Sequence, residues 1–332
     1  MEMHAAITAD VKLKNRKTIP PGGLREGSLL CYSKLESNYR LYPAFAFAEH
    51  LPSESIREGY LMFKTVTGHE QMSEKSIRDT VLEENKTYWT GRASGYSEVN
   101  RLELSTSQRQ KWKECLRKEF SRHFPERAIG DLCVLEVGTG PGFFAIILCE
   151  LGCNVTAVDL TPAMLAEAKE NAGMLADEIC FLEMDAENLR FADRSFDAVI
   201  SRNLTWNLPH PESAYAEWVR VLKPGGLLLN FDANWYAYLF DENAKAAYDR
   251  DRENSAKKEI WDQNIGENFD EMEKIACRVP LSEIRRPGWD LQMLSGLSLQ
   301  CEADEQIWRS VWSENEKISF ASTPLFLVRA RK

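Results

Sequence analysis

The chain has 332 residues, enough for one large α/β domain with additions or for two domains. Its 51 acidic and 41 basic residues give a net charge of −10, which argues against general nucleic-acid binding because phosphate contacts need a basic surface. No apolar run reaches the about 20 residues that span a membrane, the N-terminus lacks the apolar core of a signal peptide, and the eight cysteines show no C-x-x-C spacing. These features predict a cytoplasmic protein that binds neither a membrane nor a metal.

Residues 1–80 carry the least readable pattern of the chain. Pro20-Pro21-Gly22-Gly23 interrupts them, and residues 41–48 are aromatic and apolar. We interpret residues 1–80 as an N-terminal extension that packs against a main domain at 81–332. A cap over a substrate or an arm in a dimer stays open as an alternative.

Residues 88–97, YWTGRASGYS, combine aromatic rings with a cation. Ring faces attract a cationic ligand by roughly 0.5–2 kcal/mol per contact. The hydroxyl of Tyr96 or the guanidinium of Arg92 could also hold a carboxylate. The alternative is that these aromatic residues only pack a helix onto a sheet.

Residues 131–160, DLCVLEVGTGPGFFAIILCELGCNVTAVDL, read as a strand, a glycine turn, a helix and a second strand. The strands are predicted at 134–137 and 154–158 and the helix at 143–151, which makes a right-handed βαβ unit. Three glycines in five residues suit a sharp bend that a ligand approaches closely. Asp159 closes the second strand beside this turn and can accept hydrogen bonds from a ribose. The stretch therefore predicts a nucleoside-cofactor site.

The details of the turn disfavour a dinucleotide. The dinucleotide fingerprint is G-x-G-x-x-G, whereas here the spacing is G-x-G-x-G with Pro141 between the last two glycines. Glu136, two residues before the first glycine, suits an ammonium group better than a pyrophosphate. These residues resemble the class I S-adenosylmethionine-dependent methyltransferases, whose first motif is E/D-x-G-x-G-x-G. The resemblance extends over roughly 88–332.

The resemblance implies cofactor contacts at the matching positions. Residues 88–97 are similar to a Y-W-x-x-R-A-x-x-Y segment that folds over the cofactor in many small-molecule methyltransferases. A helix is predicted to begin at Thr161 or Pro162, and Leu160 and Met164 match positions along the adenosine, although Met164 is equally compatible with plain core. The cofactor-binding residues implied up to this point are Arg92, Tyr96, Glu136, Gly138, Thr139, Gly140, Gly142, Asp159, Leu160 and Met164.

A third strand is predicted at 180–184, followed by Asp185-Ala186-Glu187. This resembles the third motif of the family, in which the acid after the strand accepts the adenine amino group and the backbone N–H of the next residue meets a ring nitrogen. All three residues are therefore predicted to bind the cofactor. Asp185 could instead cap the turn that follows it.

A fourth strand at 196–201 runs into RNLTWNLPHP, and ligands bind outside the carboxyl ends of strands in such sheets. The residues on the cofactor side are predicted to be Arg202, Asn203 and Leu204. Trp206 and Asn207 are predicted to face the methyl acceptor. His210 is a weak candidate for a general base, with an ordinary loop histidine before a proline as the alternative; no other catalytic residue is predicted.

A helix at 212–221 and an L-K-P-G-G turn lead to a fifth strand at 227–231. The aromatic segment after it suits an acceptor pocket, because such pockets are apolar with few polar groups. The candidates are Asp232, Asn234, Trp235, Tyr236 and Tyr238. Residues 243–286 form a charged helical insertion, predicted to be a lid, with an outer decoration as the alternative. A helix at 289–297 and strands at 298–301 and 323–330 complete the pattern, and this last strand pair is antiparallel in the family.

The predicted fold is α/β, a doubly wound seven-stranded and mostly parallel sheet of Rossmann-like methyltransferase type. It carries the N-terminal extension and the helical insertion between strands five and six. The predicted function is methyl transfer from S-adenosylmethionine to a small molecule by in-line displacement, giving S-adenosylhomocysteine, with an O-, N-, S- or C-nucleophile left open. A non-catalytic S-adenosylmethionine-binding module and a nicotinamide-dependent oxidoreductase are the alternatives. The chain is expected to be a monomer or a homodimer.

Overall fold

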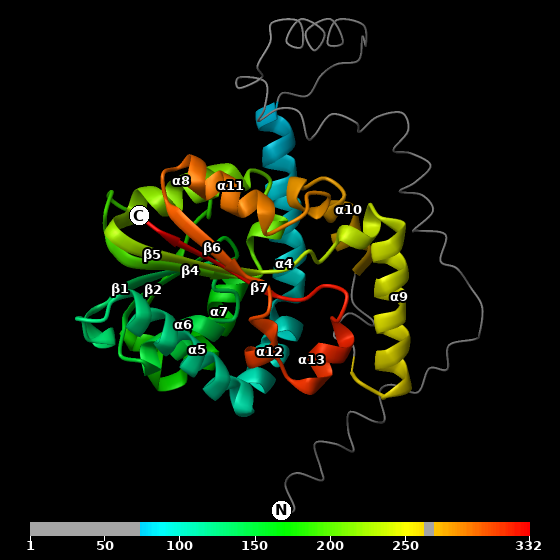
Figure 1. Ribbon diagram of the computed structural model, residues 1–332, viewed down its shortest axis with the longest axis horizontal. Coiled ribbons are helices and arrows are strands. Elements are labelled where there is room, and N and C mark those ends of the chain that lie inside the picture. Colours follow the sequence, from blue (N-terminus) through cyan, green and yellow to red (C-terminus); the bar gives the residue numbers. More distant parts are fainter. Residues whose placement is uncertain (1–73, 262–268) are drawn as a thin grey trace, which may run out of the picture. The chain divides into compact units, whose positions relative to one another are not determined.

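The computed structural model describes residues 74–261 and 269–332 (Figure 1). The predicted extension therefore lies outside the described residues up to position 73, as does the part of the insertion at 262–268. Helix α4 begins at Glu74, so the boundary predicted between residues 80 and 81 falls inside one helix.

The regular elements follow the order expected from the sequence. The strands are β1 (Cys133–Val137), β2 (Asn154–Asp159), β3 (Ile179–Glu183), β4 (Phe196–Arg202), β5 (Leu222–Asp232), β6 (Gln300–Asp304) and β7 (Phe326–Arg331). The α-helices are α4 (Glu74–Ser105), α5 (Ser107–His123), α6 (Phe143–Glu150), α7 (Pro162–Ala172), α8 (Pro211–Val221), α9 (Glu242–Lys257), α10 (Phe269–Ala276), α11 (Gly288–Gly296), α12 (Trp308–Val311) and α13 (Glu314–Ser319). The 3-10 turns are η2 (Ile129–Asp131), η3 (Gly173–Glu178), η4 (Thr205–Asn207), η5 (Ala237–Leu239) and η6 (Pro280–Ser282).

One sheet of seven strands organises the described chain, in the order β3-β2-β1-β4-β5-β7-β6. Strands β1 to β5 pair in parallel, and β7 is antiparallel to both β5 and β6. The predicted sheet is thus confirmed, including its antiparallel last pair. Because the chain moves outward from β1 in one direction and from β4 in the other, the topological switch point lies between these two strands. Ligands of open α/β sheets bind at this point.

Helices cover both faces of the sheet (Figure 1). The core on one face unites α5 and α6 with alternate residues of the central strands, around Trp112, Phe144 and Phe231. The core on the other face unites α8 and α11 with the remaining strand residues, around Tyr215 and Trp218. Both faces of the central strands are buried, which explains their nearly continuous apolar sequences.

The fifth strand differs from its prediction, since β5 begins at Leu222 and not at Leu227. The L-K-P-G-G segment lies within the strand as a bulge: Phe196 pairs with Leu222, but Ala198 pairs with Leu227. A side chain at Gly226 would come within 2.8 Å of a backbone oxygen, so the bulge requires a residue without Cβ. The turn residues at 223–226 thus interrupt the pairing with β4, which resumes at Leu227.

The last two strands begin later than predicted, at residues 300 and 326. Ser298 has a positive φ of 66°, a turn conformation that no strand contains. The segment between the two strands, predicted as a long loop, contains the short helices α12 and α13.

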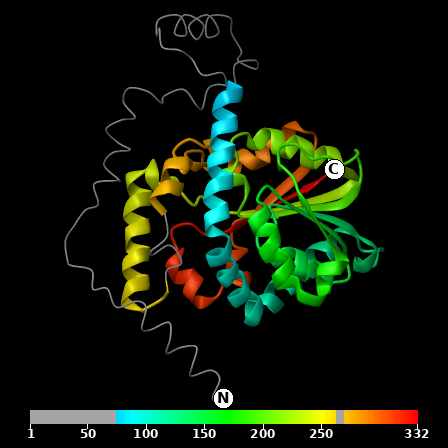
Figure 2. The same ribbon diagram turned by 180° about the vertical axis from the view of Figure 1, so that it is seen from behind.

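A third core lies at the carboxyl edge of the sheet and joins the additions to the domain. Val81 and Tyr88 of α4 pack with Met272 and Ile275 of α10 and with aromatic residues that follow β4 and β5. Figure 2 shows α4 between the sheet and α9 in projection. The described part of the insertion therefore packs on the ligand edge of the sheet.

Candidate functional site

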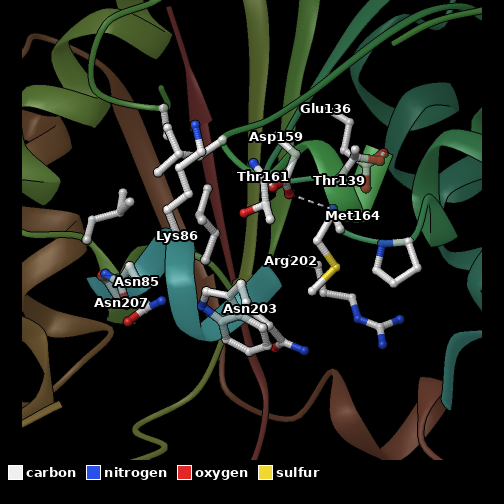
Figure 3. Close-up of a pocket in the computed structure, with 18 of the residues that line it drawn as sticks. Asn85, Lys86, Glu136, Thr139, Asp159, Thr161, Met164, Arg202, Asn203 and Asn207 are labelled. Carbon is white, nitrogen blue, oxygen red and sulfur yellow. Dashed lines mark hydrogen bonds between the residues drawn. The ribbon is translucent and has the colours of Figure 1, made fainter. Parts of the chain in front are cut away.

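A pocket of about 970 Å³ opens at the carboxyl ends of β1 to β4, the edge where the switch point lies (Figure 3). Most of the cofactor-binding residues predicted from the sequence line it. They are Tyr96, Glu136, Gly138, Thr139, Gly140, Asp159, Leu160, Met164, Asp185, Ala186, Arg202, Asn203 and Leu204. Met164 is also 2% exposed, so it serves the pocket and the core together. Three predicted residues, Arg92, Gly142 and Glu187, are not part of this lining.

All three glycines of the turn have positive φ, but each has a different neighbour. A Cβ on Gly140 would meet only the ring of Tyr96, at 3.8 Å, so this glycine faces the pocket. A Cβ on Gly138 would lie 2.7 Å from a methyl group of Leu204. Gly142 caps α6, and its Cβ would lie 3.0 Å from that of Ala168 in α7. Gly142 therefore lies where two helices approach closely, and its predicted cofactor contact stays a prediction.

Asp159 fixes the glycine turn to the end of β2. Its Oδ2 accepts a hydrogen bond from Gly140 N at 2.8 Å, and its Oδ1 accepts one from Thr161 N at 2.9 Å. Burial raises the pKa of this carboxyl group. Each carboxylate oxygen has a second lone pair, so both can also accept a hydroxyl from a ribose.

Glu136 is the buried acid at the other end of the pocket, 3% exposed. Its Oε2 accepts a hydrogen bond from the hydroxyl of Thr139 at 2.6 Å. Burial raises the pKa of Glu136 to about 8, against the opposing effects of that hydrogen bond and of Arg202. A cation bound beside Glu136 would therefore favour its ionised form and lower its pKa.

Arg202 ends β4 and is held rigidly. Its Nη2 donates to both carboxylate oxygens of Glu103 at 2.8 Å, and its guanidinium lies 4.3 Å from the ring centroid of Phe143. Burial disfavours its charge, but Glu103 outweighs this and raises the pKa of Arg202. Nη1 is buried and has no partner among the described residues. Arg202 therefore presents one unused donor at the pocket.

Asp185, in the segment after β3, both lines the pocket and caps a turn. Asp185 lines the pocket, and its Oδ1 also accepts a hydrogen bond from Glu187 N at 2.9 Å, as a turn cap does. The side chain of Glu187 points to the neighbouring loop, where its Oε1 accepts from His210 N at 2.7 Å. Glu187 thus holds two loops of the site together and does not line the pocket.

His210 lies outside the lining of both ligand cavities described in this section. It is the N-terminal cap of α8, and its Nδ1 lies 3.7 Å from a carboxylate oxygen of Glu212. The arrangement matches an ordinary loop histidine and offers no general base at the described cavities.

A second and larger cavity, of about 1770 Å³, adjoins the first. The two cavities share four lining residues, Trp89, Tyr96, Arg202 and Asn203. Of the predicted acceptor residues, Trp206, Trp235, Tyr236 and Tyr238 line this second cavity, whereas Asn207 lines the first. Arg92 lines the second cavity and not the first.

A row of stacked rings forms one wall of the second cavity. Trp206 stacks on Tyr236 with ring centroids 4.8 Å apart, Tyr238 lies 5.8 Å further, and Tyr248 of α9 stacks on Tyr238 at 4.1 Å. We call these four residues the aromatic row. Because the row runs from η4 to α9, the insertion completes the wall of the cavity. Other residues of the insertion that line it are Arg252, Ile260 and Trp261.

Asp232 and Asn234 do not line either cavity. Asp232 is the fully buried last residue of β5 and accepts hydrogen bonds from Arg286 Nη1 at 2.6 Å and Trp206 N at 3.0 Å. Arg286 also pairs with buried Asp290. The side chain of Asn234 donates a hydrogen bond to Arg286 O and accepts one from Arg286 N. The predicted acceptor contacts of these two residues are thus replaced by a network beneath the aromatic row.

Helix α4 contributes pocket residues that the sequence did not reveal: Leu82, Asn85, Lys86 and Asn100. Their only signal was the neighbouring aromatic motif. Glu103, which holds Arg202, lies 99 positions before it in the chain, so no local pattern could have paired them.

Two negative findings concern the described residues. No helix among them is long and apolar enough to cross a membrane. Within the same residues, no group of three histidine, cysteine, aspartate or glutamate side chains is arranged to hold a metal ion.

Comparisons with known proteins agree with this geometry. Residues 135–230 match the model of a family described as a methyltransferase domain. The chain is 35% identical over 162 residues to the ubiquinone/menaquinone biosynthesis C-methyltransferase UbiE of Nitrobacter hamburgensis, covering 46% of this chain and 62% of that protein. It is 38% identical over 139 residues to the demethylmenaquinone methyltransferase of Deinococcus radiodurans, covering 41% and 55%. The matched part is less than two thirds of the length of either relative.

A solved S-adenosylmethionine-dependent methyltransferase from Aquifex aeolicus is 18% identical, with a TM-score of 0.43, and the match covers 70% of this chain and 96% of that one. The sheet order and the glycine turn at the switch point define the class I methyltransferase fold. With the family match, they show that residues 135–230 belong to a methyltransferase domain of the class I S-adenosylmethionine-dependent type.

Proposed function

We propose that the chain is an enzyme that transfers a methyl group from S-adenosylmethionine to a hydroxylated aromatic small molecule. The observation that carries the proposal is the junction of the two cavities at Trp89, Tyr96, Arg202 and Asn203. A donor in the first cavity and an acceptor in the second meet at this shared wall.

The first cavity fits the donor at both ends. Asp159 and Asp185 line this cavity, which supports their contact with the ribose hydroxyls and the adenine, and Gly140 leaves room for the ligand where a Cβ would point into the cavity. At the other end, Glu136 complements the ammonium group of the methionine moiety, and the unpartnered Nη1 of Arg202 complements its carboxylate. The donor brings a methyl group already activated by its sulfonium.

The protein residues then have two tasks at the junction, orientation and exclusion of water. Holding the nucleophile, methyl group and sulfur in line can supply about 7–11 kcal/mol of the barrier reduction. The rings of Trp89 and Tyr96, with centroids 5.6 Å apart, offer aromatic faces near the sulfonium charge. The predicted lid role of the insertion fits this picture, since Tyr248 and Trp261 extend the wall of the acceptor cavity.

The aromatic row favours a flat acceptor that stacks on rings. One named relative is a ubiquinone/menaquinone biosynthesis C-methyltransferase and the other is a demethylmenaquinone methyltransferase, which supports a hydroxylated ring methylated on carbon. Burial raises the pKa of both Tyr236 and Tyr238, so neither ionises near neutral pH and neither can be a phenolate base. The acceptor ring therefore needs activation other than by these two phenols, for which its own hydroxyl groups are available.

A turnover assay tests this proposal. The full chain is incubated with S-adenosylmethionine and a reduced naphthoquinone that lacks its ring methyl group, and the product is analysed by mass spectrometry. We expect a product with one added methyl group and one S-adenosylhomocysteine per turnover. Binding of S-adenosylhomocysteine without turnover on any hydroxylated aromatic would favour the non-catalytic binding module instead. Tight NADH binding without S-adenosylhomocysteine binding would favour the oxidoreductase.

The remaining predictions concern the setting of the enzyme. A cytoplasmic location, a monomeric or homodimeric state, and a small molecule as the only partner stay proposals that rest on composition and on the cavity.

A further inference from the structure

Helix α4 buries an unusual face. Its buried positions recur at helical spacing, but many of them are polar, among them Asn85, Arg92, Asn100 and Glu103. Burying a polar side chain costs free energy unless it finds a hydrogen-bond partner. Such a face is stable where it meets a polar network or a ligand.

Asn85 is one of these residues and is 6% exposed. Its Nδ2 donates to the backbone oxygen of Asn207 at 3.0 Å. This bond fixes the orientation of the amide, because the flipped amide would set two oxygens against each other. Oδ1 therefore points away from Asn207 O, and it has no partner among the described residues. Asn85 lines the cofactor pocket, and its Oδ1 is an oriented acceptor that is buried in the pocket wall and unused among the described residues.

Asn85 belongs to the adenine end of the pocket. Its neighbour Lys86 forms an ion pair of 2.8 Å with Glu183, the last residue of β3, and Asp185 follows two residues later. In Figure 3, Asn85 and Asn207 lie side by side at one end of the pocket, and Glu136 and Thr139 lie at the other.

The loops beneath Asn85 are tied to each other as well. The bond from His210 N to Glu187, at 2.7 Å, joins the loop after β3 to the loop after β4. The indole of Trp218 also donates to Ala186 O at 3.0 Å. These loops thus enclose the adenine end of the pocket next to Asp185, and α4 covers it.

We propose that Asn85 Oδ1 accepts a hydrogen bond from the exocyclic amino group of the adenine and so selects adenosyl over deaminated donors. The inference rests on the proposed function, since it requires an adenosyl ligand in this pocket. The exocyclic amino group carries two N–H donors, so Asp185 and Asn85 can each accept one. In a deaminated donor, a carbonyl oxygen would replace the amino group and would face the acceptor oxygens of both residues without a hydrogen bond. The additional helix α4 would then be part of the specificity of the site.

Calorimetric titration with S-adenosylhomocysteine and with S-inosylhomocysteine, in which a carbonyl replaces the amino group, tests the proposal. For the unmodified chain we expect the adenosyl ligand to bind at least about 30-fold more tightly, since buried polar sites reject ligands that leave them unpaired. In Asn85→Leu, adenosyl binding should weaken about tenfold while inosyl binding changes less than about twofold. Asn85→Ala replaces this variant if the leucine variant does not fold.

Asn171→Leu is the matched control. Asn171 also holds α4, through Ser97 at 2.9 Å, but it does not line the pocket. We expect this variant to keep the preference for the adenosyl ligand even if both affinities fall. Equal weakening of both ligands in Asn85→Leu, or a preference below about threefold in the unmodified chain, would overturn the proposal for Asn85. Failure of the unmodified chain to bind S-adenosylhomocysteine would instead overturn the proposed function.

Discussion

The strongest quantitative prediction concerns proton release on cofactor binding. Glu136 is buried, and its pKa in the ligand-free protein is raised to about 8. At pH 6 its carboxyl group is therefore protonated, and ionising it beside an ammonium group costs about 1.36 kcal/mol per pH unit, or about 2.7 kcal/mol in total. The affinity for S-adenosylhomocysteine should accordingly rise about tenfold from pH 6 to pH 7 and level off above pH 8.

The affinity for the cofactor depends on pH because the pKa of Glu136 is raised in the free protein. Because the pKa is raised in the free protein, the free state holds the proton below about pH 8, and the bound state releases it to pair with the ligand cation. Binding therefore becomes weaker as the pH falls. The window from pH 6 to pH 7.5 isolates Glu136, because the ammonium group of the ligand lies beside a free carboxylate and stays protonated throughout this range.

Calorimetry in phosphate and in imidazole buffer measures the effect, because the two buffers have different ionisation enthalpies. We expect release of close to one proton per ligand at pH 6.5. Glu136→Gln keeps the shape of the side chain and should make the affinity independent of pH, with binding at least tenfold weaker than that of the unmodified chain at pH 7.5. Glu114→Gln on α5 is a surface control and should leave the profile unchanged. A flat profile with no proton release in the unmodified chain would refute the role given to Glu136.

Four further changes have defined outcomes. Gly140→Val should abolish S-adenosylhomocysteine binding, because its side chain would enter the pocket, and should also lower the melting temperature, because valine is strained at the positive φ of 52°; a folded variant with retained affinity would contradict this. Asp159→Ala should weaken binding by about 1–3 kcal/mol in calorimetry; unchanged affinity would remove it from the ribose role. Arg286→Met leaves two buried aspartates without their cation and should lower the unfolding free energy by about 3–5 kcal/mol in urea, so a loss below about 1 would contradict the network. Trp261→Ala should raise the acceptor KM and leave the affinity for S-adenosylhomocysteine unchanged. A lower affinity for S-adenosylhomocysteine would count against the place of Trp261 in the acceptor cavity.

The parts of the site that could be predicted are those that local backbone geometry dictates. A strand, a tight turn and a helix in succession require the glycines near Gly140, and the following strand must end beside them, which places Asp159. The order of the elements then determines the doubly wound sheet, because right-handed crossovers leave few other topologies. For the same reason the sequence predicted the edge where the cavities lie, since every parallel strand ends there.

The predicted residues that lie outside the lining of both cavities are those whose neighbours are distant in the chain. Gly142 shares the glycine motif, but Ala168 of another helix decides its role. Asp232 follows an apolar strand just as Asp159 does, yet Arg286, 54 positions later, captures its carboxylate. A sequence pattern gives the position of an acid at the sheet edge. Whether that acid faces a ligand or a buried cation depends on a packing partner that the local pattern does not contain.

Helix α4 shows a pattern that apolar periodicity misses but that physical chemistry can still use. Its buried face alternates apolar residues such as Val81 and Tyr88 with polar ones such as Asn85 and Glu103, so the helix looks amphipathic only when polar residues are counted as buried. That combination is costly in an ordinary core, because each buried polar group must be satisfied. Glu103 is satisfied by Arg202, whereas Asn85 Oδ1 has no described protein partner and lies in the wall of a nucleoside pocket. A long helix with polar residues at core spacing, next to a cofactor fingerprint, is therefore expected to roof the ligand and not merely to cover the sheet.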